Sequence, residues 1–68
     1  MKLTDCPLHT PLRIVRVPIR RMEELGFVPG TVVSLTEKKT GFPLIVRMPD
    51  GFYLIDRKTA EKTEVALW

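Results

Sequence analysis

The segment from Glu24 to Leu35 joins two kinds of local structure, and it constrains the fold more than any other part of this chain. Gly26 can adopt the left-handed conformation that ends a helix. The Pro29-Gly30 pair is a turn signal, because proline sets a negative φ and glycine readily supplies a positive one. Apolar residues then alternate with polar ones, as on one face of a strand. The segment therefore predicts a short helix, a turn and a strand.

The helix is predicted over about residues 19–25. Pro18 suits its first turn, where the missing amide proton would have no partner. Ile19, Met22 and Leu25 recur at a three-residue spacing and form a stripe that we expect to face the core. Two turns of helix are not stable in isolation. This helix must therefore be held by packing against the rest of the chain.

Five strands are expected, each bounded by proline, glycine or polar residues. Pro49-Asp50-Gly51 is the strongest hairpin signal, because Asp-Gly readily supplies the positive φ angles of tight hairpin turns. The polar segment 56–62 is too short for more than a single helical turn. The predicted strands are Leu12–Val17, Thr31–Glu37, Pro43–Met48, Phe52–Ile55 and Glu64–Leu67.

The first eleven residues contain Pro7 and Pro11 and are expected to form an extended arm or edge segment, with Leu3 and Leu8 as its buried points. Together these elements predict a mainly β fold, a small SH3-like β-barrel of about five strands with one short α-helix. An open five-stranded sheet capped by the helix fits the pattern equally well. At 68 residues, the chain is expected to be a single domain over 1–68.

Composition and charge favour a binding role over catalysis. The net charge is +3, and Arg13, Arg16, Arg20 and Arg21 fall within nine residues. This cluster is either a solvated face or a surface for an acidic partner or for phosphates. A chain of this length has little room for both a core and a deep active-site cleft.

The N-terminal residues show no signal-peptide pattern, and no segment approaches the about 20 apolar residues that a membrane span requires. A single cysteine cannot form an internal disulfide. We therefore expect a cytoplasmic protein that does not insert into membranes.

Candidate reactive residues are few. Cys6 and His9 form a Cys-x-x-His pair beside Asp5, but a closed zinc site needs four ligands and the chain has no other cysteine or histidine. Ser34 is the only serine, so no catalytic triad is indicated. The sequence predicts no catalytic residue, no metal site, no cofactor and no enzymatic activity.

The ordered set of motifs resembles the ferrous iron transport protein A family, FeoA. The residues that carry the resemblance are Arg21 to Gly30 with Val33 and Leu35, then Gly41 to Val46, and finally Ala60 and Val65. The resemblance covers roughly residues 3–66. Its structural motif residues in this chain are Met22, Leu25, Gly26, Pro29, Gly30, Gly41 and Pro43.

The resemblance implies a small cytoplasmic SH3-like protein that acts by contact with FeoB, the membrane ferrous iron transporter with a GTPase domain. We expect the contact surface to combine the end of the helix with the polar loop, and Phe27 is equally well interpreted as a core residue. The predicted partner-binding residues are Arg20, Arg21, Phe27, Val28, Lys38, Lys39 and Phe42.

Other roles fit less well. A nucleic-acid-binding barrel would need aromatic and basic residues interleaved on one strand face, and Phe52-Tyr53 is the only adjacent aromatic pair. An SH3-like domain of a metal-dependent regulator is a further alternative. Arg20 or Arg21 supplied to a partner's GTPase site is a less favoured mechanism. Exposed apolar residues such as Trp68 make a homo-oligomer plausible.

Overall fold

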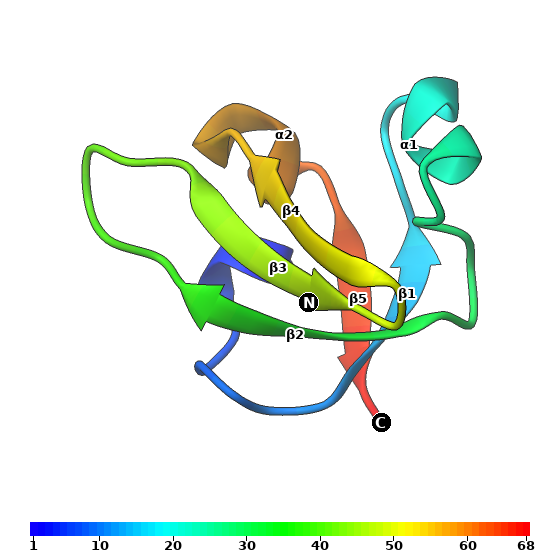
Figure 1. The fold of residues 1–68 in the computed structure, drawn as a ribbon, viewed down its shortest axis with the longest axis horizontal. Coiled ribbons are helices and arrows are strands. Elements are labelled where there is room, and N and C mark those ends of the chain that lie inside the picture. Colours follow the sequence, from blue (N-terminus) through cyan, green and yellow to red (C-terminus); the bar gives the residue numbers. More distant parts are fainter.

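The structure is a computed structural model that describes residues 1–68. It contains five strands and three short helical segments (Figure 1). Each strand begins and ends within one residue of its predicted bounds. The strands are β1 (Leu12–Arg16), β2 (Val32–Glu37), β3 (Leu44–Met48), β4 (Gly51–Ile55) and β5 (Glu64–Leu67), and the helical segments are the 3-10 helix η1 (Leu3–Asp5), α1 (Arg20–Glu24) and α2 (Arg57–Glu61).

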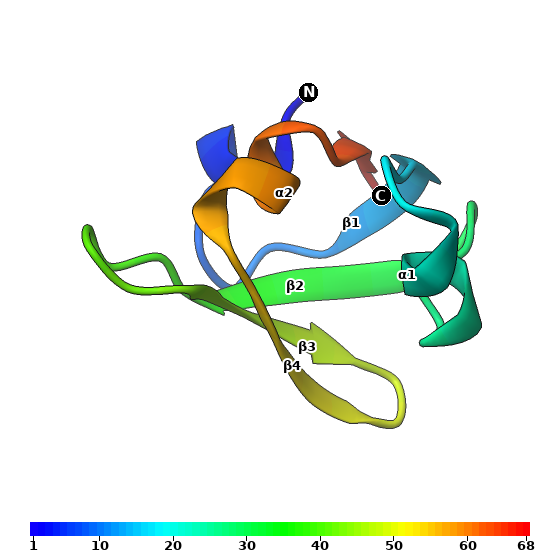
Figure 2. The same cartoon turned by 90° about the horizontal axis from the view of Figure 1, so that it is seen from above.

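The strands form one antiparallel sheet in the order β4-β3-β2-β1-β5. Register shifts between Ile14 and Arg16 and between Leu35 and Glu37 are irregularities of the kind that bend a sheet. The sheet curls so that its two halves face each other across the core (Figures 1 and 2). The edge strands β4 and β5 are not paired with each other, so the barrel is not closed. The prediction of a mainly β, SH3-like fold is confirmed.

The core lies inside this curled sheet. Inward side chains alternate along β1, β2 and β3, as the period of a strand requires. η1, α1 and α2 close the open sides with one buried residue each. The core residues are Leu3, Cys6, Leu12, Ile14, Met22, Phe27, Val33, Leu35, Leu44, Val46, Met48, Ile55, Ala60 and Val65.

Helix α1 has the predicted position but not the predicted apolar face. Only Met22 of the expected stripe is buried, whereas Ile19 and Leu25 are 49% and 48% exposed. The reason is the length of the helix. Ile19 has an extended backbone and Leu25 is the C-terminal cap, so neither continues the helical face that Met22 starts. Gly26 has a φ of 107°, which ends the helix as predicted.

Three local predictions need correction. Leu3 is buried, but Leu8 lies on the surface because the arm forms η1 and does not remain extended. The segment after β4 forms a second helix, α2, where a single turn was expected. In the β3–β4 hairpin the positive φ belongs to Gly51, which starts β4, and not to Asp50. Pro49 holds a negative φ in the loop, so a turn that needs two positive φ angles is excluded.

Candidate protein-interaction surface

An apolar surface extends across β4, and Leu54 lies at its centre. The Leu54 side chain is 69% exposed. It lines two hollows. One lies between β4 and the loop before β3, and the other lies between β4 and α1. We call this area the β4 surface and define it by its exposed or half-buried apolar residues, Ile19, Leu25, Phe42, Ile45, Phe52 and Leu54.

The first hollow, of about 390 Å³, lies on the outer side of β3 and β4. Ile45 and Leu54 face each other across the two strands, and Phe42 and Pro43 complete the apolar wall. The Lys39 ammonium lies 5.6 Å from the centre of the Phe42 ring. The Arg57 guanidinium donates hydrogen bonds to the carbonyl oxygens of Lys38 and Lys39, at 3.4 and 3.3 Å, and so holds this loop against α2.

The second hollow, of about 200 Å³, lies between α1 and β4. Ile19 and Leu25 form its α1 side, and Tyr53 and Ile55 its β4 side. Phe27 lies at its base, with its ring edge-to-face against Tyr53 at a centroid distance of 5.6 Å. Such aromatic contacts add stability beyond the area they bury. The walls are therefore apolar and anchored in the core.

Charged groups border the β4 surface. The Arg47 guanidinium lies 5.9 Å from the centre of the Phe52 ring, its cross-strand partner on β4. At the hairpin, the Tyr53 hydroxyl donates a hydrogen bond of 3.3 Å to Asp50. The negative charge of Asp50 raises the pKa of Tyr53 above its ordinary value of 10.0.

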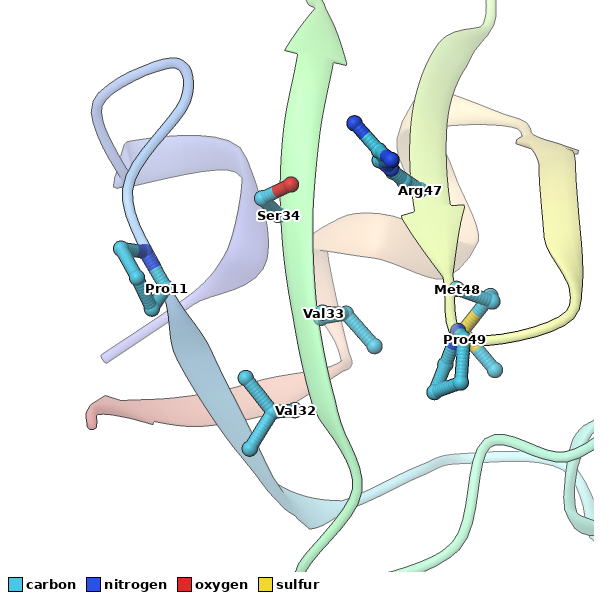
Figure 3. A pocket seen from close by; sticks show the side chains of 7 residues that line it. All are labelled: Pro11, Val32, Val33, Ser34, Arg47, Met48 and Pro49. Carbon is cyan, nitrogen blue, oxygen red and sulfur yellow. The ribbon is translucent and has the colours of Figure 1, made fainter.

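A further hollow of about 220 Å³ lies where β1 diverges from β2 (Figure 3). Figure 3 shows Ser34 on β2 and Arg47 on β3 side by side at its rim, and Pro11 and Pro49 at its two ends. His9 does not line it, so the hollow brings no histidine to Ser34. This hollow offers no arrangement for nucleophilic catalysis.

Comparison with known proteins identifies the family. The family model of the FeoA domain matches residues 1–67. This chain belongs to the FeoA family. The family is associated with ferrous iron transport, and the resemblance found in the sequence is confirmed. No curated protein matches the chain.

Solved structures share this fold. FeoA from Stenotrophomonas maltophilia, complexed with zinc, is 31% identical with a TM-score of 0.82, over 96% of this chain and 88% of that one. It is described as an SH3 domain protein with a suggested role as a ferrous iron transport activating factor. FeoA from Chlorobium tepidum is 23% identical, with a TM-score of 0.88 over 98% of this chain and 70% of that chain.

Iron(II) transport protein A from Clostridium thermocellum is 23% identical, with a TM-score of 0.85. The match covers 98% of this chain and 45% of that chain. This FeoA domain thus corresponds to less than half the length of that relative. At this level of identity, the likeness supports the fold.

Two of the predicted partner-binding residues, Lys39 and Phe42, lie together at the β4 surface. Arg20, Arg21 and Val28 are exposed on α1 and just after it. They line neither hollow of the β4 surface.

The structure places Phe27 in the core, the second of its two predicted roles: it is 2% exposed and offers a partner little beyond the base of the second hollow. A barrel this small uses the aromatic ring for its core. Lys38 is also occupied, because its ammonium donates a 2.6 Å hydrogen bond to the carbonyl of Cys6.

The Cys-x-x-His pair is not arranged as half of a metal site. Cys6 is buried, and its thiol donates to the carbonyl of Lys2 at 3.3 Å. Burial raises the pKa of the Cys6 thiol, which disfavours the thiolate that would bind a metal. His9 is exposed and has a φ of 58°. No group of three or more potential ligands lies together.

The sequence interpretation missed Ile45, Leu54 and Phe52 as surface residues. One signal was available in the segment Phe52-Tyr53-Leu54-Ile55, which is apolar on both faces of a strand. A strand with one face in water is normally polar on that face. The same alternation places Phe52 and Tyr53 on opposite faces, so they do not form one stacking platform for bases.

Proposed function

We propose that this protein is an accessory factor of ferrous iron transport that acts by contact with the FeoB membrane transporter. The observation that carries the proposal is Leu54, whose exposed side chain joins two hollows into one apolar surface. Contiguous exposed apolar patches on small domains commonly mark interaction sites. Membership of a family associated with ferrous iron transport supports FeoB as the partner.

The protein works by binding and not by catalysis. In support of this proposal, the hollow at Ser34 has no histidine in its wall, the Cys6 thiol is buried, and no three potential metal ligands lie together. No helix is long and apolar enough to cross a membrane. The proposed partner carries its GTPase domain in the cytoplasm, so the proposal places this protein there, acting as one domain over residues 1–68.

Arg20 and Arg21 stand at the start of α1, next to Ile19 of the β4 surface, and both are exposed. In this proposal they lie at the rim of the contact and interact with acidic groups of the transporter. Rim charges affect the rate of association more than the final affinity. The supply of an arginine to the partner's GTPase site stays a prediction.

The proposal is tested by titrating the protein against the purified cytoplasmic domain of FeoB in isothermal calorimetry. Leu54→Lys should weaken binding about tenfold or more, because charge is placed at the centre of an apolar contact. Leu67→Lys is the matched control, since Leu67 is an exposed leucine on β5, and it should bind like the unchanged protein. Equal binding of both variants, or no binding of the unchanged protein, contradicts the proposal.

A further inference from the structure

The outer edge of β4 carries backbone groups without a protein partner. Met48 and Gly51 close a two-residue hairpin, so they are a hydrogen-bonded pair. Bonded and non-bonded pairs alternate along an antiparallel ladder. Phe52 and Leu54 therefore direct their N–H and C=O groups away from β3. No hydrogen bond outside the β3–β4 ladder uses the backbone of residues 51–55.

Nothing in β4 protects this edge. Natural edge strands are usually blocked by lysine, proline, a bulge or a covering segment. Gly51 to Ile55 contains no charged residue and no proline, and its pairing with β3 runs over five consecutive residues without a register shift. An unprotected edge of this kind is an aggregation hazard unless another chain pairs with it.

An apolar groove lies beside this edge. The hollow of about 200 Å³ lies beside β4 on the inward-facing side, with Ile19 and Leu25 of α1 as the opposite wall. This volume is below the roughly 300 Å³ at which small-molecule sites begin. It suits single apolar side chains that project from a strand. On the other side of the edge, Phe52 and Leu54 are exposed.

We propose that β4 accepts an extended segment of the partner as a sixth strand of the sheet. The segment's backbone pairs with the N–H and C=O groups of Phe52 and Leu54. Its alternate apolar side chains enter the groove between α1 and β4, and the others lie on the outer face beside Phe52 and Leu54. Strand addition of this kind takes its affinity from the backbone and its specificity from the pockets.

Charge selects the outward-facing residues of that segment. Arg47 lies over Phe52, and Lys39 lies over Phe42 at the other end of the same face. Asp50 is at the hairpin, where its carboxylate accepts a hydrogen bond from Tyr53. Glu37 lines the same hollow as Lys39 and offsets its charge, whereas Arg47 forms no salt bridge. The outer face therefore favours an acidic residue of the segment beside Phe52. This inference rests on the proposed function only in taking the β4 surface as the contact.

The test uses synthetic peptides of eight residues that alternate valine with glutamate and have blocked ends. A first control has N-methyl groups on the backbone nitrogens that would pair, and a second replaces glutamate with lysine. Binding is followed by amide hydrogen exchange of the full chain in NMR spectra. The Val-Glu peptide should slow exchange of the Phe52 and Leu54 amides at least tenfold, and the two controls should slow it far less.

Three results overturn the inference. The first is binding of the peptide without protection of the two amides, or no binding at all. The second is equal binding of the N-methylated or the lysine peptide. The third is protection of Phe52 and Leu54 in the protein alone that grows with concentration, because a second copy then occupies the edge.

The same two amides separate this inference from the proposed function. Suppose that the FeoB domain binds and that Leu54→Lys abolishes binding, but the amides stay unprotected in the complex. The proposal of strand addition is then wrong, and the proposed contact between FeoB and the β4 surface is supported. If the peptide protects the amides but the FeoB domain does not bind, β4 accepts an added strand and the proposal of FeoB as the partner is wrong.

Discussion

The two edge strands of the sheet differ in whether another segment of the chain covers them. β5 is covered, because Val65 N–H donates to the carbonyl of Met1 at 2.8 Å, Leu3 N–H donates to the carbonyl of Thr63 at 2.9 Å, and Lys2 bridges Glu64. β4 has no such cover. Both edges border apolar side chains. Beside the covered part of β5, Val65 and Leu3 are buried, whereas Phe52 and Leu54 on β4 are exposed. A small sheet that closes one edge and leaves the other open has one place for a partner strand.

Replacing a leucine with alanine at each edge should give the largest difference in unfolding free energy between the two edges. Leu3 is fully buried under the covered edge, so Leu3→Ala should lower the free energy of unfolding by about 2–5 kcal/mol. Leu54→Ala on the open edge should change it by less than about 0.5 kcal/mol. Urea unfolding followed by circular dichroism measures both. Similar losses for the two variants would mean that β4 is packed in solution.

The next effect concerns the wall of the open groove. Gly26 has a φ of 107°, and an added methyl group would lie 3.4 Å from the Met48 Cε. Because a residue with a side chain is strained at this φ, Gly26→Ala should cost about 1 kcal/mol or more in unfolding free energy, and relief of the strain should shift the C-terminal end of α1 beside the groove. Gly41→Ala is the matched control, because Gly41 also has a positive φ but lies in the loop before β3 and does not adjoin the groove.

Only Gly26→Ala should weaken binding of the valine-glutamate peptide, measured by calorimetry. If both glycine variants bind the peptide like the unchanged protein, α1 is not a wall of the binding site.

On the covered edge, Thr63 is buried and its hydroxyl donates to the carbonyl of Thr59 at 3.0 Å. Thr63→Val keeps the shape but leaves that carbonyl without the hydroxyl, so a loss of about 1 kcal/mol in thermal or urea unfolding is expected. Peptide binding at β4 should not change. Equal or higher stability of Thr63→Val would show that this hydrogen bond does not stabilise the junction between α2 and β5.

The smallest effect is a pH dependence beneath the arm. Burial raises the pKa of the Cys6 thiol above its ordinary value of 9.0, so the unfolded chain loses this proton first as pH rises. The stability it contributes is complete below pH 9 and declines as pH rises toward the folded pKa. Unfolding free energies between pH 8 and 10 should fall less steeply for Cys6→Ala than for the unchanged protein. Parallel curves would contradict a buried thiol.

Much of the fold could be predicted from the sequence because its signals are local. Prolines and glycines lie at or near at least one end of β1, β2, β3 and β4, and alternation marks the inward residues of β2 and β3. Gly26 predicts the helix end, because glycine readily adopts the positive φ that closes a helix. The second helix, α2, was missed because four of its five residues are polar. It is held by the burial of Ala60 and by packing against η1, which is far away in the sequence.

The interaction surface was predicted only in part. Lys39 and Phe42 were found because a polar loop with an exposed aromatic residue is visible in sequence. Leu54 and Ile45 were not, because cross-strand pairing decides that they lie together. Phe27 was ambiguous for a related reason, as an apolar residue after a helix can face either way. Which edge strand is covered depends on where the N-terminal arm packs, and no local sequence pattern specifies that position.

Amide hydrogen exchange at the two edges, with and without the FeoB cytoplasmic domain, tests the central claim most directly. In the protein alone, the amides of Val65 and Leu3 should exchange slowly, and those of Phe52 and Leu54 quickly. On addition of the FeoB domain, Phe52 and Leu54 should become protected while Val65 and Leu3 stay unchanged. Binding that leaves Phe52 and Leu54 in rapid exchange would contradict the account.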